Sequence, residues 1–328
     1  MKENILEKVE RLIKEKKIEQ DQYKLEAKLT KKNINLGFNK KLNDIICCPE
    51  CYNSLVKDDI LTCHFCRKDY PIYNGIPAPI SDTELQNKIA DDLKGQMHLK
   101  EIIKSKISMP DERLWMPRAK NIIKKILYEN NPDGENKYVV NLGSGVESFF
   151  KRVFKPLKSL IRIGIPHDGK VNAYGDAMAL PLKNDSVDLF FSSSVIEHLP
   201  DPEKAVSELF RTIKPGGLVY AEIPFIGAYH MAPYDYQRYT ISGIESLFNR
   251  HGFKLVEKGI CTGPITALVL LFQHAIVEAI PIGPIQYLFR VTLTWILHPL
   301  KYLDFLFGRT KWAEYLACNF FYLGRKPG

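Results

Sequence analysis

Several features that would place this 328-residue chain in a simple class are missing from its sequence. There is no run of about 20 consecutive apolar residues, so we predict no transmembrane helix. There are no internal repeats or low-complexity tracts, which argues against repeat architectures. Residues 1–17 are charged throughout and lack an apolar core, so we expect no secretory signal there. The composition, 45% hydrophobic and 26% charged, fits a globular chain of about two domains.

The centre of the chain also has no net charge. Lysine and arginine number 46 against 38 acidic residues, a balance of +8. Residues 1–46 account for +4 and residues 281–328 for another +4, so the stretch between them sums to zero. Nucleic-acid binding needs a focused basic surface, so we do not expect a nucleic-acid partner. The sequence leaves the oligomeric state open.

Cysteine is scarce except in one short segment, where five of the seven cysteines lie within twenty residues. Two C-x-x-C pairs are separated by eleven residues, and their four thiolates can converge on one tetrahedral ion. Such a closed shell predicts a structural Zn²⁺ that helps a small segment to fold. Unpaired buried cysteines are the alternative, and either reading suits the reducing cytoplasm. The predicted ligands are Cys48, Cys51, Cys63 and Cys66, with Cys47 and His64 as bystanders that could replace a ligand.

The segment after the second cysteine pair strengthens this interpretation. Residues 69–77 continue as D-Y-P-I-Y-N-G-I-P. Taken together, residues 45–80 resemble the zinc-ribbon domain related to the small activator subunit of tRNA and protein methyltransferases. In that family the domain is a partner or appendage of the catalyst, which implies a catalytic unit elsewhere in the chain.

Residues 137–261 alternate strand-like and helix-like segments, which predicts an α/β fold with a parallel sheet. A strand at 138–142 runs directly into Gly143-Ser144-Gly145, and a helix is expected at 147–156. A glycine turn between a strand and a helix lets the backbone approach a ligand closely. Ser148 stands where the dinucleotide fingerprint has a further glycine, which counts against NAD or FAD.

Four segments in a fixed order resemble the S-adenosyl-L-methionine (SAM)-dependent methyltransferases of class I, type 11. They are N-L-G-S-G at 141–145, G-D-A-x-x-L-P at 175–181, E-H-L-x-D-P at 197–202 and K-P-G-G at 214–217. The resemblance implies a Rossmann-like seven-stranded sheet with helices on both faces and an antiparallel seventh strand between the fifth and sixth. It also implies SAM as the cofactor and methyl transfer as the activity.

The same resemblance assigns the cofactor residues, with one departure. The family has an acid at the end of the second strand, where it holds the ribose hydroxyls, but this chain has Gly164 there. Either Asp168 reaches back, or cofactor affinity is weakened, or the site is degenerate. The implied cofactor residues are Asn141, Gly143, Ser144 and Gly145 under the methionine part, Gly164 by the ribose, Asp176 and Ala177 by the adenine, and Ser193, Glu197 and His198 at the end of the fourth strand.

Polar side chains gather in the aromatic segment 224–240, after the fifth strand. Open α/β sheets bind ligands beyond the carboxyl ends of their strands, so we expect acceptor recognition here. His230 is the candidate general base, and Asp235, Tyr236 and Arg238 complete the candidate catalytic set. Alternatively, Asp235 and Arg238 pair to stiffen the loop. The segment also resembles a group associated with surface-polysaccharide gene sets, which implies a glycan or lipid-linked acceptor.

An apolar stretch, residues 263–315, interrupts the methyltransferase-like unit before its last strand. We expect buried cap helices there; a peripheral contact with an anionic membrane surface, on its inner face, is the alternative. Two further functions stay open: a non-catalytic adaptor that binds a partner through the ribbon, and an RNA or protein methyltransferase. The predicted organisation is a helical leader at 1–44, a zinc ribbon at 45–80, a helical linker at 81–136 and a methyltransferase domain at 137–328.

Overall fold

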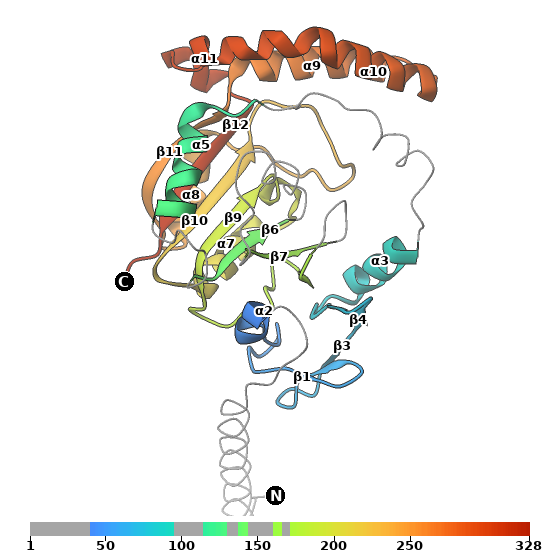
Figure 1. Ribbon diagram of the computed structural model, residues 1–328, viewed down its shortest axis with the longest axis vertical. Helices are drawn as coiled ribbons and strands as arrows, with labels where there is room; N and C mark the ends of the chain where they lie inside the picture. The colour runs from blue at the N-terminus through green and yellow to red at the C-terminus, as the bar shows by residue number, and fades with distance from the viewer. Residues whose placement is uncertain (1–39, 95–113, 130–136, 144–159, 166–170) are drawn as a thin grey trace, which may run out of the picture.

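A computed structural model describes residues 40–94, 114–129, 137–143, 160–165 and 171–328 (Figure 1). Several expectations fall outside these residues. They concern most of the helical leader, the cofactor-turn residues Ser144 and Gly145, the helix at 147–156 and Asp168.

Within the described residues, seven strands form one sheet in the order β11-β12-β10-β9-β6-β7-β8. The pairs from β10 through β8 are parallel, which confirms the predicted mostly parallel α/β sheet. The last strand, β12, pairs antiparallel with both β10 and β11, in the position that the resemblance implies. The strands are β6 Val139–Leu142, β7 Leu160–Gly164, β8 Ala173–Tyr174, β9 Val187–Ser193, β10 Ile213–Pro224, β11 Lys254–Thr262 and β12 Asn319–Arg325.

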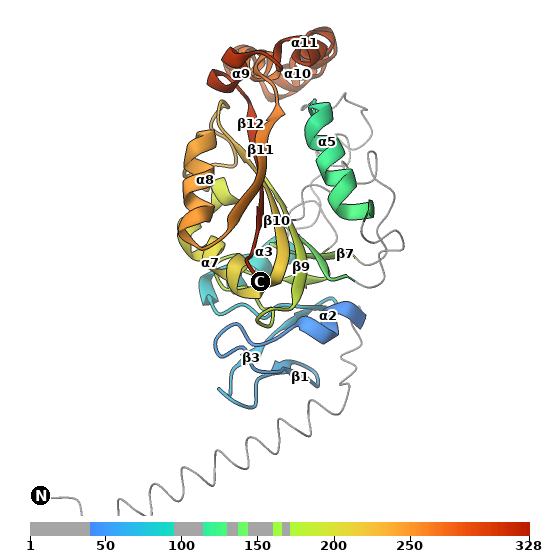
Figure 2. The same ribbon diagram turned by 90° about the vertical axis from the view of Figure 1, so that its left-hand side faces the viewer.

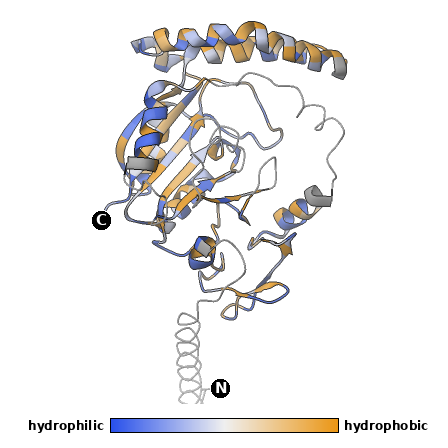
Figure 3. Ribbon diagram, in the orientation of Figure 1, coloured by the Kyte–Doolittle hydropathy of each residue, from blue (hydrophilic) through white to orange (hydrophobic). Residues whose placement is uncertain are grey.

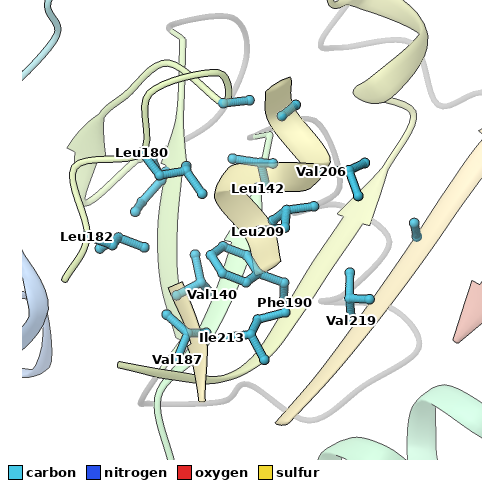
Figure 4. Packing of buried hydrophobic residues seen from close by; sticks show 14 of the residues in the cluster. Val140, Leu142, Leu180, Leu182, Val187, Phe190, Val206, Leu209, Ile213 and Val219 are labelled. Atoms are coloured by element: carbon cyan, nitrogen blue, oxygen red, sulfur yellow. The ribbon is translucent and has the colours of Figure 1, made fainter. Parts of the chain in front are cut away.

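Helices cover both faces of this sheet (Figure 2). Helix α5 (Pro117–Lys124), which continues as a π-helical turn, packs on one face. Helices α7 (Pro202–Thr212) and α8 (Ile241–Arg250) pack on the other. Successive strand residues point to opposite faces, so Val139 joins the α5 cluster while Val140 joins the α7 cluster. Figure 4 shows the α7 side of this core, where Phe190 lies among aliphatic side chains of β6, β10 and α7.

One boundary of the sheet differs from the expectation. The proline and glycines of the K-P-G-G motif at 214–217 predict a turn between a helix and a strand, but β10 begins at Ile213. Its pairing with β9 shifts register between Ile213 and Leu218, so the proline and glycines form an irregular stretch within the strand. Such an irregularity accommodates residues that do not fit a regular ladder.

The cysteine-rich segment lies at the end of the molecule opposite α9 and α10 (Figures 1 and 2). Its side chains join the same hydrophobic cluster as the α7 face of the sheet, so this segment and the sheet share one core. Backbone bonds fix the junction: the Cys47 amide donates to the Pro181 carbonyl and the Lys183 amide to the Ile45 carbonyl. The elements are α2 Lys40–Ile45, β1 Val56–Lys57, β2 Leu61–Thr62, β3 Asp69–Tyr70, β4 Ile72–Tyr73, β5 Ile76–Pro77 and α3 Thr83–Lys94.

A helical platform, residues 264–316, follows β11 and lies across the other end of the molecule (Figure 1). It contains α9 (Pro264–Glu278), α10 (Gly283–Leu297), α11 (Asp304–Phe307) and two 3₁₀ segments. Because β11 runs parallel to β10, the platform starts at the carboxyl edge of the sheet. The expectation of buried cap helices is wrong for the outer face, where Leu288 is 67% exposed. In the described part of the chain, no helix is long and apolar enough to cross a membrane.

Candidate functional site

The centre of the sheet offers a ligand crevice by its topology alone. Strand β7, the next strand along the chain from β6, lies on one side of β6, and β9 lies on the other. In open parallel sheets, such a reversal of strand order leaves a crevice at the carboxyl ends, where ligands bind. The residues that follow β6 and β9 are therefore the first candidates for a binding site.

Gly143, directly after β6, is shaped for close approach of a ligand. Its φ is +84°, and a Cβ built there would lie 2.4 Å from Cγ2 of Val195. Its amide donates to the Ile163 carbonyl at 2.8 Å, which fixes Gly143 beside β7 at the carboxyl end of β6. A side chain at this position is excluded both by backbone conformation and by space. The predicted glycine turn thus has a local structural requirement for glycine at its first position.

Two buried polar groups lie in the strands that flank this turn. Asn141 is 1% exposed and Ser192 fully buried. The Asn141 Oδ1 and the Ser192 Oγ find no hydrogen-bond partner among the described residues. A buried polar atom without a partner is costly, so an orphaned one beside a crevice suits an absent ligand. The cradle at Gly143 and the Asn141 amide oxygen therefore fit the methionine end of the cofactor that the sequence implies.

Ser193 is held from within the protein. Its Oγ donates to Oε2 of Glu222 at 2.7 Å, while Oε1 of Glu222 accepts from the Tyr220 hydroxyl at 3.0 Å and the Cys261 thiol at 2.9 Å. Burial, reinforced by the Glu222 carboxylate, raises the pKa of Tyr220 well above its usual value. Sequence reasoning missed Glu222; the available signal was a single acid within an otherwise apolar strand. This network orders the carboxyl ends of β9 and β10.

The ribose and adenine predictions have different structural settings. Gly164 ends β7, is buried and offers no side chain to a ribose. Asp176 is 9% exposed, and its Oδ1 accepts from the Met178 amide at 2.8 Å. Burial raises the pKa of the Asp176 carboxyl. Ala177 packs into the shared core. The roles assigned to these three residues stay predictions.

Two histidines from different predicted groups meet beside this crevice. His198 ends a short 3₁₀ turn after β9, and its ring centroid lies 4.8 Å from that of His230. The His198 Nδ1 is 2.7 Å from the Tyr234 carbonyl oxygen. Because a carbonyl only accepts, that nitrogen carries the proton and Nε2 keeps its lone pair. Burial lowers the pKa of His198, which favours the neutral ring.

Glu197 completes this group from the buried side. Its Oε1 lies 3.7 Å from Nε2 of His198, and one ligand atom from each of Glu197, His198 and His230 lies within 4.8 Å of the others. Two imidazoles and a carboxylate can hold a divalent transition metal, and they can also move a proton. The structure therefore gathers basic groups just beyond the carboxyl end of β9, at the crevice.

Asp235 and Arg238 form a bidentate ion pair within the loop that carries His230. The Asp235 carboxylate also accepts from the His230 amide at 2.9 Å, and Nη2 of Arg238 donates to the Ala228 carbonyl at 3.1 Å. Hydrogen bonds from Arg238 lower the pKa of Asp235 to about 2. These contacts match the loop-stiffening alternative. The ring of Tyr236 is half exposed, and its amide donates to the Glu197 carbonyl at 2.9 Å.

The four predicted metal ligands come together in the cysteine-rich segment. Their sulfur atoms lie within 4.8 Å of one another, with Cys48–Cys66 at 3.5 Å and Cys51–Cys63 at 3.4 Å. These distances are too long for disulfides, whose S–S bond is about 2.05 Å. They approach the separation of about 3.8 Å that a tetrahedral site with Zn–S bonds near 2.3 Å requires. The donor set and its spacing fit a closed tetrahedral metal.

The two predicted bystanders stand apart from this set. Cys47 does not belong to the four-sulfur group, and burial raises its pKa to about 12, so it remains a thiol. His64 is exposed. Tyr70 contacts the group, with its hydroxyl 3.0 Å from the Cys48 sulfur.

Comparisons with known proteins point to methyl transfer for part of the chain. Residues 164–221 match the family described as Methyltransferase domain. A 42-residue stretch is 57% identical to an uncharacterized methyltransferase of Mycobacterium bovis, and it makes up 13% of this chain. That stretch spans only 16% of the length of this curated relative. The activity, substrates and partners of the whole protein are therefore matters for proposal.

Solved structures resemble the chain more loosely. The SAM complex of phosphoethanolamine N-methyltransferase 2 from Haemonchus contortus has a TM-score of 0.39 at 17% identity, covering 65% of this chain and 53% of that one. A SAM dependent methyltransferase from Archaeoglobus fulgidus has a TM-score of 0.38 at 17% identity, covering 63% and 94%. Scores at this level carry no argument about activity.

Proposed function

We propose that the chain is a SAM-dependent methyltransferase with a fused structural zinc ribbon. The observation that carries the proposal is the cradle at Gly143, which lies at the crevice of a sheet whose flanking segment, 164–221, matches a methyltransferase domain. SAM supplies an activated methyl group bound to a sulfonium sulfur. The protein therefore has to orient the acceptor, exclude water and accept a proton where the acceptor is a hydroxyl.

The residues around the crevice divide these tasks. Gly143 and Asn141 hold the methionine end of the cofactor, through close backbone approach and an unsatisfied amide oxygen. Glu222 fixes Ser193 and with it the end of β9. His230, whose backbone amide donates to Asp235 and whose ring faces His198, is the group that accepts the proton of an acceptor hydroxyl. Asp235 and Arg238 act as positioning residues for that imidazole.

The acceptor in this proposal is a saccharide hydroxyl, carried on a lipid. The support is the polar and aromatic loop beside His230, where Tyr229, Tyr234 and Tyr236 are exposed. Aromatic faces and fixed polar groups are the usual means of binding sugars and other polyhydroxylated ligands in a shallow site. The zinc ion in this proposal has a structural role only, because four thiolates leave no open coordination position.

Calorimetric titration with S-adenosylhomocysteine tests the cofactor site. We expect micromolar binding by the wild type and a loss of about tenfold or more in Gly143→Ala, because that Cβ clashes with Val195 in a left-handed backbone. Gly227→Ala is the matched control, since a Cβ there meets nothing within 4 Å. No wild-type binding at high micromolar ligand would favour the adaptor function, which the missing acid at Gly164 supports.

Replacement of His230 tests the proton-acceptor role separately. In His230→Ala we expect the transfer of tritium from labelled SAM to an isolated lipid-linked saccharide to fall about 100-fold. The affinity of the same variant for S-adenosylhomocysteine should stay within about twofold of the wild-type value. Unchanged transfer in this variant would remove His230 from the mechanism.

A further inference from the structure

The outer face of the helical platform is apolar at helical spacing. On α10, Ile285, Leu288, Phe289, Trp295 and Ile296 are 43 to 67% exposed. Positions separated by three, four, seven and eleven residues lie on one side of a helix, so these side chains form one stripe. Figure 3 shows hydrophobic residues recurring along both long helices of the platform. An amphipathic helix in a globular protein normally turns such a stripe toward the core.

The exposed surface extends beyond α10. On α9, Leu268 and Phe272 are 47% and 55% exposed, one helical turn apart. The segment after α10 adds another group of large exposed apolar side chains. They are Leu300, Tyr302, Leu303, Leu306, Trp312, Tyr315 and Leu316. Large exposed apolar side chains that gather along one segment in this way indicate an interaction site rather than ordinary protein surface.

Polar groups are also buried inside the platform, beside small apolar side chains such as Ala267 and Val277. Gln273 of α9 is buried and donates to the Thr294 hydroxyl of α10 at 2.5 Å. Asp304 is fully buried and accepts from the amides of Ile265 and Thr266 and from the Thr266 hydroxyl, at 2.6 to 3.0 Å. Lys301 is also fully buried. Polar groups therefore help to tie the helices together, while many of the large apolar side chains of the platform are exposed.

We propose that this outward face lies on a phospholipid bilayer, with its aromatic and aliphatic side chains at the boundary between headgroups and acyl chains. The helices lie flat in this arrangement, because 15 residues span about 22 Å and a crossing needs about 30 Å. Trp and Tyr side chains favour the interface, and the exposed Arg309 and Lys311 beside Trp312 suit lipid phosphates.

This inference stands apart from methyl transfer, because it rests on the platform alone. If both hold, the carboxyl edge of the sheet, where the platform begins, faces the bilayer. An acceptor anchored in the lipid would then reach the crevice without leaving the membrane. A second copy of the chain is the competing occupant, since two apolar faces could also cover each other.

Vesicle flotation tests the proposal with the full chain and no cofactor. We expect the wild type to float with vesicles of phosphatidylcholine and phosphatidylglycerol, and Leu288→Asp with Ile296→Asp to lower the bound fraction about tenfold or more. The matched control is Val256→Asp, an apolar side chain 49% exposed on β11 outside the platform. The control should float like the wild type.

Two further measurements keep the outcome decisive. Trp295 and Trp312 are exposed whereas Trp115 is buried, so vesicle addition should shift the tryptophan emission to the blue, and less so in Trp295→Phe. Thermal unfolding of the double variant should match that of the wild type, because the replaced side chains face solvent.

The proposal is overturned if the folded wild type does not float with the vesicles. The proposal is also overturned if the wild type forms a stable dimer that does not bind vesicles and if the double variant is a monomer. Loss of S-adenosylhomocysteine binding alone would count against the proposed enzyme, not against the membrane contact.

Discussion

The predicted ribbon, residues 45–80, and the platform, residues 264–316, lie at opposite ends of the molecule but are held together by opposite means. The ribbon turns its apolar side chains into the core of the sheet and gathers four thiol groups at one point. The platform leaves many of its large apolar side chains exposed and buries polar groups between its helices. The ribbon thus packs against the body and offers a site that fits a metal, whereas the platform presents a surface that fits a partner outside the chain.

The largest effect expected from this comparison is the loss of a metal ligand. Cys63→Ser should lower zinc affinity about a hundredfold, since structural zinc contributes about 10–16 kcal/mol through four ligands. The unfolding midpoint should fall by about 10 °C, because the shared core loses its fixed ribbon. Metal content by mass spectrometry and thermal unfolding by circular dichroism measure both.

Cys47→Ser is the matched control for that experiment, because Cys47 is buried beside a ligand but lies outside the four-sulfur group. It should retain one zinc per chain. Equal zinc content in the two variants would contradict the assigned ligand set.

A smaller effect is expected from the polar interior of the platform. Asp304→Ala removes the acceptor for two amides and one hydroxyl at the start of α9. We expect a loss of about 2 kcal/mol in the free energy of unfolding, measured in urea. Leu288→Asp, on the exposed face, should cost about 0.5 kcal/mol or less. The reverse order of these two variants would mean that the platform packs through its apolar face after all.

The smallest effect concerns the hydroxyl of Tyr70, which lies 3.0 Å from the Cys48 sulfur. Tyr70→Phe keeps the buried ring and removes this contact. Outer partners of metal ligands tune affinity, and we expect a loss of about tenfold in a chelator competition assay. Tyr52→Phe serves as the comparison, because its ring packs under the Arg211 guanidinium rather than against the sulfur cluster. Equal affinities for the two variants would show that the Tyr70 hydroxyl has no influence on the metal.

Sequence reasoning predicted the features that local pattern controls. The alternation of strand-like and helix-like segments predicted the mostly parallel sheet. The two C-x-x-C pairs predicted the sulfur cluster, because four similar groups at fixed spacing have few other uses. The zinc ion itself stays a prediction. The turn predicted at 214–217 was wrong. Glycine and proline normally end regular structure, but here they lie within a strand that changes register.

The residues that local pattern could not identify are those whose partners lie far along the chain. Glu222 reaches Cys261, and Asp304 reaches Thr266, each 38 or 39 residues away. In the sequence, these acids interrupt apolar segments without any sign of what they bind. The exposure of large apolar side chains on the platform could not be predicted for a similar reason. Helical periodicity shows that an apolar stripe exists but does not show which way it faces.

The single core shared by the ribbon and the sheet has a consequence for how this protein can change over evolutionary time. Leu55 and Leu61 pack in the same cluster as Val140 and Leu180. Removal of the ribbon would therefore expose apolar side chains of the sheet to solvent. The helix that follows the ribbon also reaches the loop that carries His230, with the Lys88 ammonium 3.7 Å from the centre of the Tyr234 ring. Recombination therefore cannot replace the ribbon by that of another protein without changes in the sheet as well. A ribbon taken from another protein would have to fit both the shared apolar core and the contact between Lys88 and Tyr234.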